Sequence, residues 1–168
     1  MLLIITCTSC VRTYYVSRHA EKNEAATGGT TTAATPLSQA GQDRANALRD
    51  ELAGKSIKYV FSTNTVRTRS TGRPTAIAQN ADTLLYNAAP GSDSMRKFIA
   101  RLQGIKKDVL IIGHSNTVDD IANALSGQQS VAGDLLEHQF DNLFIIKYRV
   151  FLGTKKFFSV KKYGVPTP

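Results

Sequence analysis

The chain has 168 residues but only two cysteines, no tryptophan and few acidic residues. Both cysteines, Cys7 and Cys10, lie near the start, and the rest of the chain has none. Disulfides therefore do not hold the body of this fold together. The apolar run over residues 1–5 is far shorter than the roughly 20 residues that span a bilayer. These absences exclude a disulfide-stapled fold and a membrane span at residues 1–5.

The scarcity of acidic residues makes the chain basic. There are 13 Asp and Glu against 21 Lys and Arg, so the formal charge is +8. A basic surface favours anionic partners, including phosphorylated small molecules, nucleic acid and anionic membranes. The basic residues are scattered apart from three lysine pairs, and no nucleic-acid recognition motif accompanies them. We therefore predict no nucleic-acid partner.

Composition and length predict one soluble domain over residues 12–168, preceded by a leader over residues 1–11. The short apolar run that ends in Thr-Ser-Cys is typical of the tail of a bacterial lipoprotein signal, with Cys10 as the lipidated residue. This interpretation predicts a location at the bacterial cell envelope, and its alternative is a cytoplasmic protein. Two other interpretations are a redox Cys-x-x-Cys motif and a leader with two inert thiols. The redox motif normally opens a helix, whereas a strand follows here.

Basic residues follow three predicted strands, at the point where each strand ends. They are Arg18 and His19 after residues 14–16, Arg67 after residues 57–61, and His114 after residues 109–112. A single Arg or His at such a position is usually a solvated surface residue. Three strands that deliver basic residues to one edge instead indicate an open parallel sheet, whose ligands bind beyond the carboxyl ends of the strands. An arginine beside a histidine suits the binding of a phosphate while the histidine attacks phosphorus.

The remaining pattern alternates helices with strands. A helix starts at a Ser38 cap, carries an apolar face at Gly41, Ala45, Leu48 and Leu52, and ends at Gly54. The other expected elements are a helix capped by Asn64 that Pro74 kinks or restarts, a strand over 83–86, helices over 95–102 and 118–125, and a hairpin of 143–150 with 157–160. Residues 27–35 form a Thr- and Gly-rich loop that either covers the site or is a plain surface loop.

Four segments resemble the motifs of the histidine phosphatase superfamily, also called phosphoglycerate mutase-like, in the same order along the chain. They are Ser17–Glu21, Leu37–Gly41 with Ala45, Ser62–Gly72, and Val109–Ser115. The resemblance covers roughly residues 12–165 and implies a three-layer α/β/α sandwich with a mostly parallel central sheet. The departures from the family pattern are Ala20 and Ser115 in place of glycines, Gly72 in place of Ala, and Ala25 where many members have a phosphate-binding Asn.

The resemblance implies a phosphatase that works through a covalent phosphohistidine at His19. Arg18 and Arg67 would bind the phosphoryl oxygens, and His114, as imidazolium or as a hydrogen-bond donor, would stabilise charge. Backbone N–H groups around Ser115, and Asn23 next to the first motif, are further candidates for binding phosphate. No metal site and no cofactor are predicted, and His138 is expected on the surface. The alternatives are a non-catalytic module that binds phosphate or a phosphoprotein, and a phosphoglycerate-type mutase.

The general acid is the open question of the sequence. Asp93 is the best-placed carboxylate by motif order, and Asp119 and Asp120 are its rivals. For Asp93 the alternative is a helix-terminal charge that interacts with the helix dipole. Glu21 is expected to orient His19 by a hydrogen bond. The expected substrate is a phosphorylated small molecule or a phosphoprotein.

Overall fold

The computed structural model describes residues 10–87, 89–150 and 153–167, and Cys7 and the apolar run over 1–5 lie outside them. Four parallel strands and two antiparallel strands form its single described sheet. The strands are β1 (Cys10–Arg18), β2 (Ile57–Ser62), β3 (Asp82–Leu85), β4 (Asp108–Gly113), β5 (Asn142–Val150) and β6 (Thr154–Lys162). The helices are α1 (Gln39–Glu51), α2 (Val66–Gln79), α3 (Asp93–Gly104) and α4 (Val118–Ser126), with a short 3₁₀ turn, η1, at Glu24–Thr27.

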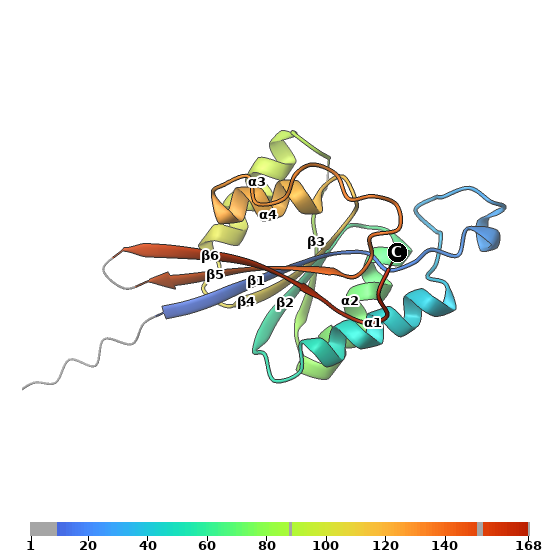
Figure 1. Cartoon of the computed structure of the whole chain (residues 1–168), viewed down its shortest axis with the longest axis horizontal. Helices are drawn as coiled ribbons and strands as arrows, with labels where there is room; N and C mark the ends of the chain where they lie inside the picture. The colour runs from blue at the N-terminus through green and yellow to red at the C-terminus, as the bar shows by residue number, and fades with distance from the viewer. Residues whose placement is uncertain (1–9, 88, 151–152, 168) are drawn as a thin grey trace, which may run out of the picture.

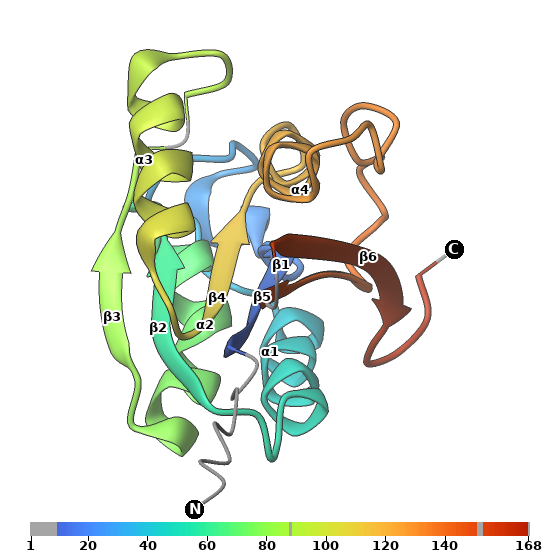
Figure 2. The ribbon, with the colours of Figure 1, turned by 90° about the vertical axis from the view of Figure 1, so that its left-hand side faces the viewer.

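The strand order is β3-β2-β4-β1-β5-β6. The first four strands of that order are parallel, and β5 and β6 add an antiparallel hairpin to the side of β1. Figures 1 and 2 show α3 and α4 on one face of the sheet and α1 and α2 on the other. The predicted α/β/α sandwich with a mostly parallel sheet is therefore confirmed.

Each face of the sheet has its own apolar core. Residues of α3 and α4, such as Phe98 and Leu125, pack with alternate residues of β1, β4 and β5. On the other face, Leu48 and Leu52 pack with Leu110 and Ile112 of β4. Because successive side chains of a strand point to opposite faces, a central strand buried on both sides is continuously apolar, as β4 is.

Most predicted elements agree with the structure, and the differences are local. The side chain that caps α2 is Thr65, which accepts a hydrogen bond from the Thr68 N–H, and not Asn64. The helix runs through Pro74 without a restart. The short edge strand starts at Asp82 rather than at residue 83, and η1, which was not predicted, directly precedes the expected loop and overlaps it only at Thr27.

Two glycines of the predicted motifs are required by close packing. A Cβ atom at Gly41, in the first turn of α1, would collide with the backbone oxygen of Glu21. A Cβ atom at Gly72 of α2 would lie 2.8 Å from a methyl carbon of Val60 in β2. Gly41 therefore lets α1 lie directly against the chain that leaves the first motif. Gly72, a departure from the family pattern, has a steric reason because it lets α2 approach β2.

The start of β1 lies within the segment expected to be a leader. Cys10 pairs with Val150 across the antiparallel β1–β5 ladder, so the sheet begins two residues before the predicted boundary at residue 12. The lipid anchor at Cys10, the cell-envelope location and the domain boundary remain predictions. No helix in the described ranges is long and apolar enough to cross a membrane.

Candidate active site

The two histidines meet because their strands are adjacent and in register. Arg18 at the end of β1 pairs with Gly113 at the end of β4, so His19 and His114 are the next residues on neighbouring parallel strands. The His19 N–H donates to the Gly113 carbonyl at 2.9 Å, and the two imidazole rings are 5.4 Å apart between centroids. The predicted convergence at the carboxyl edge of the sheet is therefore present.

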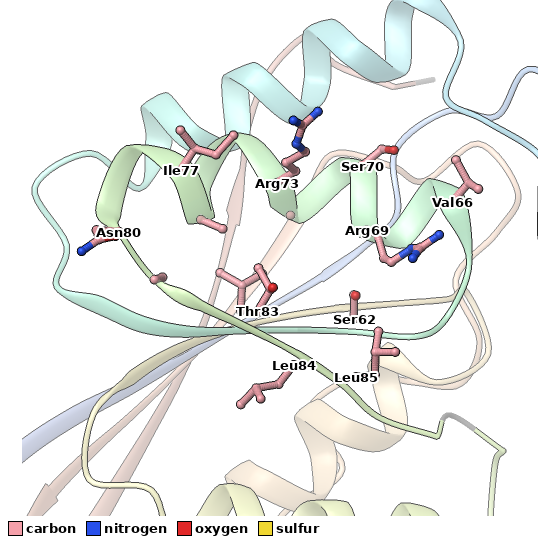
Figure 3. Close-up of a pocket in the computed structure, with 14 residues that line it drawn as sticks. Ser62, Val66, Arg69, Ser70, Arg73, Ile77, Asn80, Thr83, Leu84 and Leu85 are labelled. Atoms are coloured by element: carbon pink, nitrogen blue, oxygen red, sulfur yellow. The ribbon is translucent and has the colours of Figure 1, made fainter.

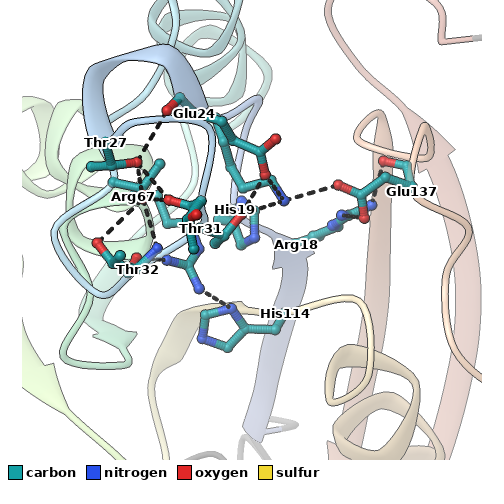
Figure 4. Close-up of polar contacts among 12 residues, drawn as sticks. Arg18, His19, Glu24, Thr27, Thr31, Thr32, Arg67, His114 and Glu137 are labelled. Atoms are coloured by element: carbon teal, nitrogen blue, oxygen red, sulfur yellow. Dashed lines mark hydrogen bonds and ion pairs between the residues drawn. The ribbon is translucent and has the colours of Figure 1, made fainter.

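Arg67 reaches this edge from the first turn of α2. Its Nη1 donates to the carbonyl of Thr32 at 2.7 Å, and its Nη2 lies 3.5 Å from Nδ1 of His114 (Figure 4). Thr32 belongs to the loop after the first motif, and its neighbour Thr31 lines the same cavity as the histidines. The Thr- and Gly-rich loop therefore contacts the site.

A cavity of about 490 Å³ contains most of the predicted residues. Its lining comprises the predicted residues Arg18, His19, Arg67, His114 and Ser115, together with Lys22, Thr31, Asn116 and Glu137. Basic side chains predominate, so the cavity suits an anion. Ser115 lies in the turn that precedes α4, which begins at Val118 as predicted.

Contacts around His19 determine its protonation. Nδ1 lies 2.8 Å from the Ala20 carbonyl, which can only accept, so Nδ1 carries the proton and the lone pair of the neutral ring is on Nε2. The His19 side chain is only 4% exposed. Burial lowers the pKa of His19 to about 3, and the charges of nearby His114, Arg18 and Arg67 act in the same direction. His19 is therefore neutral near pH 7.

His114 has the opposite tautomer. Arg67 can only donate, so Nδ1 of His114 accepts and Nε2 carries the proton, which it donates to the Thr63 hydroxyl at 2.8 Å. The Thr63 hydroxyl lies 3.0 Å from that of Thr68, which donates onward to the Thr63 carbonyl. Burial lowers the pKa of His114 to about 4, and the charges of Arg67 and Arg18 add to the effect. His114 is therefore neutral in the free protein, and its one N–H is directed at Thr63, so its expected role toward phosphate remains a prediction.

Both arginines retain a hydrogen-bond donor without a partner. Arg18 is buried, and the central carbon of its guanidinium lies 4.2 Å from the centroid of the Phe140 ring. The Nε atoms of Arg18 and Arg67 are buried and have no hydrogen-bond partner within the part of the chain that the structure describes. A buried donor left without a partner costs about 1–3 kcal/mol, so each of these two arginines is held at the cavity at a cost in stability.

Two of the predicted site residues do not line this cavity. Asp93 starts α3, is exposed, and forms an ion pair with Arg96 one turn along the helix. Asn23 accepts a hydrogen bond from the Ala26 N–H and so caps η1. Asp93 thus lies at the helix terminus, which was the alternative to its role as general acid. The Asn23 side chain caps η1 and does not face the cavity lining.

The other carboxylates considered also point elsewhere. Asp119 and Asp120 do not line the cavity, although Asp119 is buried and burial raises its pKa. The expected contact between Glu21 and His19 is absent. Glu21, which is partly exposed, instead forms an ion pair at 2.7 Å with the buried Arg44 of α1. Its sequence position next to His19 was misleading because the chain turns away toward α1 immediately after β1.

Sequence reasoning missed Lys22, Thr31, Asn116 and Glu137. Glu137 accepts from Arg18 Nη2 at 2.8 Å and from Lys22 at 3.0 Å (Figure 4). It lies in the irregular segment between α4 and β5, where no periodicity or motif draws attention to it. Lys22 could have been found from its place three residues after His19. Thr31 lies in the loop over residues 27–35, and the sequence did not decide whether that loop covers the site.

A larger cavity of about 850 Å³ lies between α2 and the edge strand β3 (Figure 3). Its polar lining includes Arg69, Arg73 and Asn80. None of the predicted site residues lines it, so the histidine cavity is the candidate active site.

Comparison with known proteins bears on the family and the fold of this chain. The family model of the histidine phosphatase superfamily (branch 1) matches residues 14–88. The putative phosphohistidine phosphatase SixA of Nakamurella multipartitia is 21% identical, with 93% of this chain and 96% of that chain covered and a TM-score of 0.65. The mycobacterial glucosyl-3-phosphoglycerate phosphatase in complex with VO3 is 13% identical, with 91% and 100% covered and a TM-score of 0.66. The comparison with curated proteins finds no significant match.

Fold and site together define a phosphoglycerate mutase-like α/β protein with two histidines and two arginines at the carboxyl edge of its sheet. The family match covers the first two strands, α1, α2 and β3, and the fold likeness extends over more than nine-tenths of the chain. The recognition of the histidine phosphatase superfamily from the sequence motifs is thereby confirmed.

Proposed function

We propose that this protein is a phosphatase that hydrolyses phosphomonoesters, or phosphohistidine in a phosphoprotein, through a covalent phosphohistidine at His19. The observation that carries the proposal is the neutral His19 ring with its lone pair on Nε2, in one cavity with two arginines. Neutral imidazole is the nucleophilic form of histidine. A module that only binds phosphate would need the cations but not a free nucleophile.

The first chemical step transfers the phosphoryl group to the protein. The Nε2 lone pair of His19 attacks phosphorus while the bond from phosphorus to the leaving group breaks. The leaving group keeps the electron pair of that bond, takes a proton from solvent and departs. The planar guanidinium groups of Arg18 and Arg67 bind the phosphoryl oxygens and stabilise their charge. The negative charge of the substrate favours the protonated form of His114, which then strengthens this stabilisation.

The second step restores the enzyme. Water attacks phosphorus, the bond from phosphorus to Nε2 breaks, inorganic phosphate leaves, and the proton of the water passes to solvent or phosphate. The Ala20 carbonyl holds Nδ1–H throughout, so the ring returns to the same tautomer. Splitting the hydrolysis into two displacements is the advantage of covalent catalysis.

The lining of the cavity favours substrates that need little help from a general acid. Glu137 is the sole carboxylate among the described lining residues. Burial would raise its pKa, but contacts with Lys22 and Arg18 outweigh burial and lower it, so Glu137 is ionised near pH 7. The leaving nitrogen of phosphohistidine is far less basic than an alkoxide and needs less protonation. The name of the SixA neighbour, a putative phosphohistidine phosphatase, also supports phosphohistidine as the substrate.

Rapid-quench labelling tests the proposal. The protein is mixed with radiolabelled phosphohistidine peptide or p-nitrophenyl phosphate and quenched in base, and the expected product is an acid-labile, base-stable phosphoenzyme. His19→Ala should abolish both the labelling and turnover. His138→Ala, which removes an exposed histidine, should change neither. Binding of phosphate without labelling or turnover in the unaltered protein would instead support the binding module.

A further inference from the structure

Glu137 places a negative charge at the edge of the site proposed to bind phosphate. Its two carboxylate oxygens accept from Arg18 at 2.8 Å and from Lys22 at 3.0 Å. Arg18 is 2% exposed and Lys22 16% exposed, whereas the Glu137 side chain is 71% exposed. An exposed residue has therefore been drawn onto two largely buried cations of the cavity.

The contacts of Arg18 show which of its donors remain for a ligand. A guanidinium has five N–H groups. Nη1 donates to the carbonyls of Leu136 and Glu137 at 2.9 Å each, and Nη2 donates to the Glu137 carboxylate. Nε is buried and has no partner among the residues placed in the structure, and the second N–H of Nη2 also has none. A phosphoryl oxygen that binds this second N–H shares Nη2 with Glu137, so the two anions would lie side by side.

The cavity has little positive charge left after it binds one phosphoryl group. Its described lining contains three cations, Arg18, Lys22 and Arg67. Lys22 is shared between Glu137 and Glu24, each at 3.0 Å. A second anionic group on the substrate would meet the Glu137 carboxylate and no spare cation. Like charges a few ångströms apart repel strongly in a partly desolvated site.

The hollow next to the site is also without charge. It has a volume of about 550 Å³, includes His114, and is otherwise lined by uncharged side chains: Thr63, Asn64, Leu85, Tyr86, Asn87 and Ala89. The hollow shares His114 with the histidine cavity, so a leaving group that extended past that ring would lie beside it. Hydroxyl, amide and aromatic groups there suit a neutral leaving group.

We infer that Glu137 is a specificity-determining residue that restricts the site to substrates with one phosphoryl group and no second anion close to it. The substrate class is a phosphorylated compound whose leaving group is neutral or cationic, and bisphosphates and phosphorylated carboxylates are disfavoured. This inference rests on the proposed function for the role of Arg18 and Arg67. It deepens that function by adding the chemical class of the substrate.

The test compares Glu137→Gln with the unaltered protein in two measurements. Calorimetry measures the binding of inorganic phosphate and pyrophosphate, and kinetics measures kcat/KM for phenyl phosphate and 4-carboxyphenyl phosphate. The variant should gain about five-fold more affinity for pyrophosphate than for phosphate, the size expected of a largely exposed ion pair. Its kcat/KM for 4-carboxyphenyl phosphate should rise by a similar factor relative to that for phenyl phosphate.

Asp134→Asn is the matched control, because Asp134 has the same charge in the same segment but none of the ion pairs of Glu137. It should leave both ratios unchanged. Equal effects of Glu137→Gln on both ligands of each pair would overturn the inference. So would a loss of kcat for phenyl phosphate that spares p-nitrophenyl phosphate, because Glu137 would then be the general acid. The binding ratio needs no turnover, so a shifted ratio without a phosphoenzyme would refute the proposed function alone.

Discussion

Acidification should destabilise this protein through its buried histidines, and His19 provides the clearest test. The pKa of His19 is lowered to about 3 in the folded protein, chiefly by burial, against about 6.5 in an unfolded chain. The unfolded state therefore takes up the proton first as the pH falls. The free energy of unfolding is expected to be highest above about pH 6.5 and to decrease as the pH falls toward 3.

The magnitude follows from the difference between the two pKa values. Each pH unit below 6.5 costs about 1.4 kcal/mol while the folded ring stays neutral. Between about pH 7.5 and about pH 5, His19 should therefore remove roughly 2 kcal/mol of stability. The side chain is 4% exposed, so solvent screening reduces this amount little.

Urea unfolding near those two pH values measures the effect in three proteins. The unaltered protein should lose stability on acidification, and His19→Gln should lose roughly 2 kcal/mol less. His138→Gln, which removes an exposed histidine, should behave as the unaltered protein does. The carboxylates titrate alike in all three proteins, so the comparison isolates the histidine. An equal loss in His19→Gln and the unaltered protein would refute a strongly lowered pKa.

Three further predictions concern single side chains. Arg67→Lys should weaken competitive inhibition by vanadate and lower kcat/KM by about ten-fold or more, since a charge-assisted hydrogen bond contributes about 1.5–3 kcal/mol. The control is Arg69→Lys, which should change neither quantity because Arg69 lines the other cavity. Glu21→Gln should lower the free energy of unfolding by about 1–3 kcal/mol, because it leaves the buried Arg44 without its charged partner. Glu51→Gln, whose partner Lys161 is exposed, should cost about 1 kcal/mol or less in the same urea titration. Asp93→Asn should leave the hydrolysis of both phenyl phosphate and p-nitrophenyl phosphate unchanged, and a selective loss on phenyl phosphate would restore Asp93 as the acid.

Most elements of the fold were predictable because they depend on local patterns. The apolar stripe from Met95 to Leu102 buries one face of α3 as its spacing predicts. Gly127, which adopts a left-handed conformation, ends α4 where expected. The four basic residues of the site were also predictable, because a residue that follows a parallel strand reaches the same edge as those after the neighbouring strands.

Residues brought to the site by irregular segments were not predictable in this way. Glu137 reaches Arg18 across more than a hundred residues, and nothing in its own neighbourhood indicates that contact. Glu21 and Asp93 were chosen for their place in the sequence. The structure turns Glu21 toward Arg44 and leaves Asp93 exposed beside Arg96.

The protonation of the two histidines depends on contacts that only the folded chain provides. The residue type predicts an imidazole that titrates near neutral pH, but burial beside Arg18 and Arg67 lowers the pKa of both rings. The tautomers follow from the Ala20 carbonyl on one ring and from Thr63 and Arg67 on the other. Local pattern thus predicts which side chains gather at the edge of the sheet. Desolvation and hydrogen bonds from distant segments determine which nitrogen is free to react.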